Sequence, residues 1–179
     1  MKNDLIKEIQ KALSSIIQSD IYALSLYLEY ANDNPYEPII ILGYNTVSNF
    51  NKVCKTVDIL EAKWNYAYWL QNEIVVFGED ESRTIVKNWF IKNNLGYMTY
   101  EEFFSNDINE DLCNKIDDKI KNELIKVVKH LHCSGFINQK FNTEIPVIIH
   151  QLEYYNEIAE INKKANPNYL LKEFIEFFG

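Results

Sequence analysis

The chain has few of the residues that mark linkers, phosphate-binding loops or disulfide frameworks. Its 179 residues include five Gly, four Pro and three Cys, and Arg occurs once. The Gly residues are isolated from one another, which excludes a P-loop and a dinucleotide-binding fingerprint. No apolar run approaches the roughly 18 residues that span a bilayer, and the N-terminal segment lacks the apolar stretch of a secretory signal. We therefore expect a soluble protein without a membrane partner.

The cysteines are odd in number and lack the spacing of a metal site. Cys54, Cys113 and Cys133 are scattered along the chain, a pattern that favours free buried thiols in a reducing, cytoplasmic compartment. The sequence is also rich in Ile, Asn, Lys and Tyr. This mixture is typical of AT-rich codons and indicates a bacterial origin, so the many Asn residues are not interpreted as a site.

What is abundant is apolar material: 47% of the residues are hydrophobic and 14% are aromatic. A chain of this length and composition can bury one substantial core, so residues 1–179 are predicted to form a single domain. Helical periodicity predicts helices over 4–18 (with Asp4 as N-cap), 46–60, 82–93, 110–132 (capped by Asn109) and 169–178, and a capping box begins a short one at Thr99. Alternation or short apolar runs predict strands at 22–30, 39–42, 74–77 and 145–149.

The order of these elements contains too few strand–helix–strand units for a doubly wound sheet. The turn-rich segment 31–38 joins the first two strands as a hairpin, and Pro146 suggests the start or the edge position of the last strand. Asn166 and Pro167 have the pattern of a helix start. The predicted fold class is α+β, with a small, mainly antiparallel sheet packed with several helices.

The net charge of −8 argues against nucleic acid as a partner, because such proteins need a basic patch to neutralise phosphates. The excess is local: residues 58–118 hold 13 acidic residues against 5 basic ones. Glu79, Asp80 and Glu81 form its densest run. Such a run is typical of a solvated surface, and it is also suited to attracting a basic partner.

The most unusual local feature is the aromatic segment Trp64–Trp69, which contains Trp64, Tyr66, Tyr68 and Trp69. It is compatible with a strand or a helix. Tryptophan and tyrosine are common both in cores and in recognition surfaces, so this segment is either core packing or part of a binding site.

No catalytic or metal-binding motif is found. His130, His132 and Cys133 are close in sequence, but His residues two apart point to different sides of a helix and no second ligand pair has zinc-like spacing. Adjacent carboxylates such as Glu101–Glu102 complement helix N-termini without any catalytic duty. We therefore assign no catalytic residue, no metal ligand and no cofactor from the sequence.

Several short motifs resemble the bacterial domain-of-unknown-function family 4303. They are Ile21–Tyr27, the Lys63–Trp69 element with its two tryptophans, the Gly135–Phe136 pair after the long helix, and Asn166–Pro167. The resemblance extends over residues 20–170. The sequence differs from the family pattern at Lys63, where the pattern has Arg, and at Tyr68, where it has Glu. The family implies an architecture but no established activity. Some small acidic bacterial domains of this kind resemble immunity proteins that neutralise toxins.

Two functions follow as hypotheses. The first is a non-enzymatic, immunity-like domain that binds a basic protein partner such as a toxin, for which the candidate residues are Trp64, Tyr66, Tyr68, Trp69, Glu79, Asp80 and Glu81. The alternative is a small-ligand module or enzyme with a pocket near Trp64–Trp69. The sequence does not predict the oligomeric state.

Overall fold

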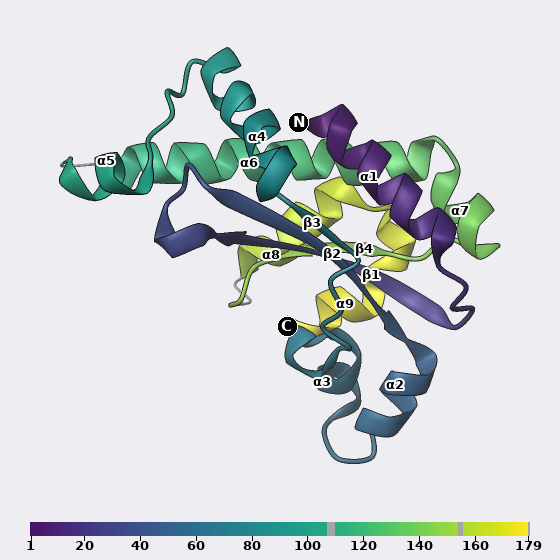
Figure 1. The fold of residues 1–179 in the computed structure, drawn as a ribbon. Coiled ribbons are helices and arrows are strands. Elements are labelled where there is room, and N and C mark those ends of the chain that lie inside the picture. Colours follow the sequence, from purple (N-terminus) through teal and green to yellow (C-terminus); the bar gives the residue numbers. More distant parts are fainter. Residues whose placement is uncertain (107–109, 154–155, 179) are drawn as a thin grey trace.

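The computed structural model describes residues 1–106, 110–153 and 156–178. Its centre is a four-stranded sheet in the order β3-β2-β1-β4 (Figure 1). The strands are β1 (Ile21–Tyr30), β2 (Pro38–Thr46), β3 (Val75–Phe77) and β4 (Val147–His150). β2 pairs antiparallel with β1 and β3, while β4 lies parallel to β1. The prediction of a single α+β domain with a mainly antiparallel sheet is confirmed.

Helices cover both faces of this sheet. Their bounds are α1 (Lys2–Ser15), α2 (Val47–Val53), α3 (Ile59–Trp64), α4 (Asp80–Lys92), α5 (Tyr100–Ser105), α6 (Glu110–Cys133), α7 (Phe136–Phe141), α8 (Asn156–Ala165) and α9 (Lys172–Phe177), with 3₁₀ turns η1 (Ala31–Asp33), η2 (Tyr66–Tyr68) and η3 (Asn168–Leu170). Figure 1 shows α1, α4 and α6 gathered on one side and α3 with α9 on the other.

The alternation along β1 explains this two-sided arrangement. Leu24, Leu26 and Leu28 belong to the larger core cluster, which also contains buried residues of α1, α4 and α6. Ala23, on the opposite face, belongs to a smaller cluster with Trp64 of α3 and Phe174 of α9. Because successive side chains of a strand point to opposite faces, one strand serves both cores.

Two predicted helices have different limits in the structure. The helix predicted over 4–18 ends at Ser15, and Ile17 is 99% exposed instead of lying on the apolar stripe. The N-cap of α1 is Met1, and Asp4 is the N3 residue of its capping box. The helix predicted over 46–60 is interrupted, because Asp58 caps a separate helix by accepting from the amides of Leu60 and Glu61.

Near the C-terminal end of the chain, the prediction that Asn166 caps a helix is wrong. Its side chain bonds the backbone of Val147 in β4 instead, and Pro167 precedes η3. Helices α7 and α8 were not predicted. Asn109, the predicted cap of the long helix, lies outside the described residues, while the Thr99–Glu102 capping box of α5 is confirmed.

Candidate functional site

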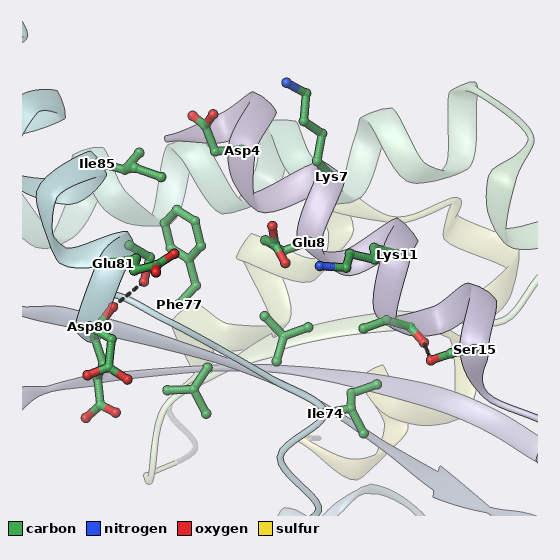
Figure 2. Close-up of a pocket in the computed structure, with 15 residues that line it drawn as sticks. Asp4, Lys7, Glu8, Lys11, Ser15, Ile74, Phe77, Asp80, Glu81 and Ile85 are labelled. Atoms are coloured by element: carbon green, nitrogen blue, oxygen red, sulfur yellow. Dashed lines mark hydrogen bonds between the residues drawn. The ribbon is translucent and has the colours of Figure 1, made fainter.

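The candidate site is a groove between α1, β3 and the first turn of α4 (the α1–β3–α4 groove). Its volume is about 910 Å³. The residues that line it are Asp4, Lys7, Glu8, Lys11, Ala12 and Ser15 of α1, Ile74–Phe77, and Glu79, Asp80, Glu81, Ser82 and Ile85. Figure 2 shows Phe77 between the carboxylates of Asp80 and Glu81 on one side and α1 on the other. The groove therefore combines an apolar floor with a charged rim.

A tight turn places the acidic residues at this rim. Gly78 has a φ of +118°, and a Cβ there would lie 2.1 Å from the carbonyl oxygen of Pro38, so only glycine fits. The Gly78 amide donates to Ser82 Oγ at 2.8 Å, and this hydroxyl donates to the Glu79 carbonyl at 2.6 Å. The chain thus leaves β3 and starts α4 within a few residues, which brings Glu79, Asp80 and Glu81 to the end of the strand.

The rim is predominantly acidic. Five carboxylates (Asp4, Glu8, Glu79, Asp80, Glu81) and two ammonium groups (Lys7, Lys11) line the groove. Among the residues that the structure describes, none of the ion pairs involves Glu8 or the triplet Glu79–Glu81. These carboxylates are exposed, and the five acidic residues of the groove outnumber its two lysines, so the rim attracts cationic groups.

The predicted aromatic residues are in a different part of the molecule. Trp64 and Trp69 are 3% and 6% exposed and belong to the smaller core cluster on the α3–α9 side of the sheet. Trp69 Nε1 donates to the carbonyl oxygen of Lys63 at 2.9 Å. Tyr68 is 36% exposed. The two indoles are core residues, and the structure does not bring this segment together with Glu79–Glu81.

Tyr66 of the same segment covers a buried polar pair. Ser25 Oγ lies 2.7 Å from His150 Nε2, and His150 Nδ1 lies 3.2 Å from the carbonyl oxygen of Gln151. A carbonyl oxygen can only accept, so Nδ1 carries the proton and Nε2 accepts from the serine hydroxyl. The Tyr66 ring lies 4.5 Å from the imidazole, centroid to centroid.

Burial dominates the electrostatics of this pair. It lowers the pKa of His150 to about 4, against the opposing effect of the Gln151 carbonyl, so the imidazole is neutral at pH 7. Burial also raises the pKa of Tyr66, with a smaller contribution from Glu73. The tautomer suits a general base, but Ser25 and His150 are each only 1% exposed. In this structure the pair is a buried contact between β1 and β4.

The other histidines and the cysteines do not converge. His132 Nδ1 lies 2.7 Å from a Glu144 carboxylate oxygen and its Nε2 lies 3.2 Å from Asn166 Oδ1, whereas His130 and Cys133 are exposed. Within the described ranges, no group of three or more His, Cys, Asp or Glu side chains is placed to hold a metal ion.

Comparisons with protein-family models, with curated proteins and with solved structures found no match to this chain. The resemblance to family 4303 therefore stays a prediction. Across the part of the chain that the structure covers, no helix combines the length and the apolar character needed to cross a membrane.

Sequence reasoning identified the triplet Glu79–Glu81 but missed the residues that complete the groove. Asp4 and Glu8 are four residues apart on α1, opposite its apolar stripe, which makes them neighbours on one helix face. That spacing was a usable signal for an acidic helix face. Nothing in the sequence placed this face beside residue 79, because the contact between α1 and β3 is made only by the folded chain.

Proposed function

We propose that this chain is a non-enzymatic domain that binds a basic segment of another protein in the α1–β3–α4 groove. The observation that carries the proposal is the placement of exposed carboxylates around an apolar floor that includes Phe77 and Ile85. A rim of one charge sign speeds the encounter with a partner of the opposite sign, and an apolar floor gives the bound segment a surface to bury. An immunity role is the special case in which the basic partner is a toxin.

The same placement argues for a protein segment over a nucleic acid. Phosphates would be repelled by Glu79, Asp80 and Glu81, whereas lysine and arginine side chains would pair with them at hydrogen-bond distance. The alternative of an enzyme or small-ligand module near Trp64–Trp69 stays a prediction. It has less support, because both indoles are packed in the core and the α1–β3–α4 groove does not include them.

The test uses a fluorescent peptide of alternating lysine and valine, with an alternating glutamate–valine peptide as its counterpart. We expect the basic peptide to bind at low ionic strength and to be weakened at about 0.3 M salt, where exposed charges are strongly screened. The variant E79Q/D80N/E81Q should bind it about tenfold more weakly, because three exposed pairs contribute roughly 0.5 kcal/mol each.

A matched control removes the same charge elsewhere. Glu101, Asp118 and Glu176 are exposed on α5, α6 and α9, so E101Q/D118N/E176Q removes the same three negative charges without changing a residue of the groove. Equal weakening by the two triple variants would mean that only the overall charge matters. Equal binding of the basic and acidic peptides would rule out the proposal.

A further inference from the structure

The two edge strands of the sheet differ in the partners of their outward-pointing backbone groups. At the β4 edge, Asn162 of α8 and Asn166, the first residue after this helix, bond the strand backbone as a neighbouring strand would. The Asn166 side chain accepts from the Val147 amide at 2.8 Å and donates to the Val147 carbonyl at 2.9 Å. Asn162 makes the same pair of bonds with Ile149, at 2.9 and 2.7 Å. This edge is closed by two side chains four residues apart, one in the last turns of α8 and one directly after it.

The opposite edge, at β3, lacks such a cover. Outside the pairing with β2, no hydrogen bond of the described chain involves the backbone of Val75, Val76 or Phe77. The strand itself carries no charge and no proline, the usual devices that block an edge. Val76 is 38% exposed, and the α1–β3–α4 groove runs along this strand. The edge is thus open, apolar and of high strand propensity.

We propose that the basic partner binds as an added β-strand along β3. This binding mode rests on the proposed function of the groove and specifies how the partner is held there. An extended segment beside Val75–Phe77 pairs over three residues, about 10 Å of strand. Alternate side chains then lie beside Val75 and Phe77 on the face of β3 that lines the groove, and the end of the segment next to Gly78 meets the carboxylates at 79–81. The chemistry that fits is an extended segment alternating apolar and basic residues.

A second copy of this chain fits the edge less well. Two β3 strands paired antiparallel about Val76 would place Glu79 of each copy opposite Glu73 of the other. Both residues are exposed, and like charges directly opposite each other in neighbouring strands are destabilising. The residues that flank the open strand therefore oppose self-association and favour a cationic occupant.

The test compares the lysine–valine peptide with the same peptide N-methylated at its central backbone nitrogens, which keeps every charge but cannot extend a sheet. We expect at least about tenfold weaker binding of the methylated form, since a methylated nitrogen cannot donate a main-chain hydrogen bond to β3. Amide hydrogen exchange at the β3 amides that point away from β2 should slow on addition of the unmodified peptide only.

The outcomes separate the two proposals. Equal binding of both peptides, weakened in each case by E79Q/D80N/E81Q and without protection of β3, would overturn strand addition and leave the proposed function standing. Absence of binding by either peptide would overturn both. A chain that dimerises by itself with protection of Val75–Phe77 would overturn the assignment of a basic partner to this edge.

Discussion

At the scale of single residues, the buried tryptophans Trp64 and Trp69 differ in their hydrogen bonding. Trp69 Nε1 donates to the Lys63 carbonyl, which also accepts from Tyr22 Oη at 2.6 Å. Trp64 Nε1 is buried and has no hydrogen-bond partner within the described residues. An N–H group buried without a partner costs about 1–3 kcal/mol of desolvation. One indole nitrogen thus stabilises the fold and the other opposes it.

This contrast predicts that replacing the two indoles by phenyl rings has unequal effects. W69F loses packing and a hydrogen bond, whereas W64F loses packing but also removes the unpartnered N–H. We expect W69F to lower the free energy of unfolding by about 1–3 kcal/mol more than W64F. Urea denaturation of both variants measures the difference. Equal losses, or a larger loss for W64F, would contradict the hydrogen-bond assignment.

The sequence identified these residues as a group but left their environment open. Periodicity could not choose between strand and helix for 64–69, because the segment is neither: α3 ends at Trp64 and η2 occupies Tyr66–Tyr68. The turn is fixed by Asn65, whose side chain accepts from the Ala67 amide. Whether an aromatic side chain packs in the core or faces a partner depends on the elements that cover it. Here the covering element is α9, which is distant in sequence from residues 64–69.

At the scale of elements, the docking of α8 on β4 depends on a buried amide. Asn162 is fully buried, and besides bonding the Ile149 amide and carbonyl it donates to the Ile158 carbonyl of its own helix at 2.9 Å. A leucine at this position has a similar size but satisfies none of these groups. The Asn162 amide therefore determines how the helix sits against the strand edge.

We predict that N162L lowers the free energy of unfolding by about 2–4 kcal/mol, since two buried backbone groups of Ile149 lose their partner. The control is N138L, because Asn138 is exposed on α7 and its replacement should change stability by less than about 0.5 kcal/mol. Thermal or urea unfolding provides the comparison. A loss for N162L no larger than that for N138L would mean that the strand edge does not need the amide.

The same asparagines explain which elements the sequence could and could not predict. The strands, the hairpin, α4 and the capped helix α5 followed from alternation, periodicity and local capping. Helix α8 did not, because its buried face includes Asn162 and continues to Asn166. A polar residue in an interior position breaks the apolar stripe that periodicity detects. Its function as a substitute strand partner is visible only once β4 lies beside it.

At the scale of the whole molecule, the sequence predicted an acidic excess in residues 58–118, but not how it is arranged. In the structure part of this excess lies at the N-termini of α4, α5 and α6, while other members, such as Asp58 at α3 and Asp118 within α6, lie elsewhere. Of the described acidic residues in this region, only Glu79, Asp80 and Glu81 line the α1–β3–α4 groove, where Asp4 and Glu8 of α1 join them. Charge counts along a chain therefore locate candidate residues, whereas the surface that they form depends on contacts between distant segments.

The stability of the whole molecule in acid should depend on His150. Burial lowers its pKa in the folded chain to about 4, below the value of about 6.5 in an unfolded chain. Between these two values the unfolded chain binds a proton that the folded chain excludes, so stability falls as the pH decreases from 6.5 towards 4. Complete titration through this window corresponds to a loss of roughly 3 kcal/mol from this residue.

We predict that the variant H150N loses this part of the pH dependence, because asparagine does not titrate. The readout is the free energy of unfolding at about pH 7 and pH 4.5, where the wild type should lose about 2–3 kcal/mol more than H150N. The carboxylates that titrate in the same range are present in both proteins, so their contribution to the pH dependence cancels in the comparison. H130N is the matched control, since His130 is exposed on α6, and it should follow the wild type. A pH dependence of H150N equal to that of the wild type would show that protonation of His150 does not oppose folding.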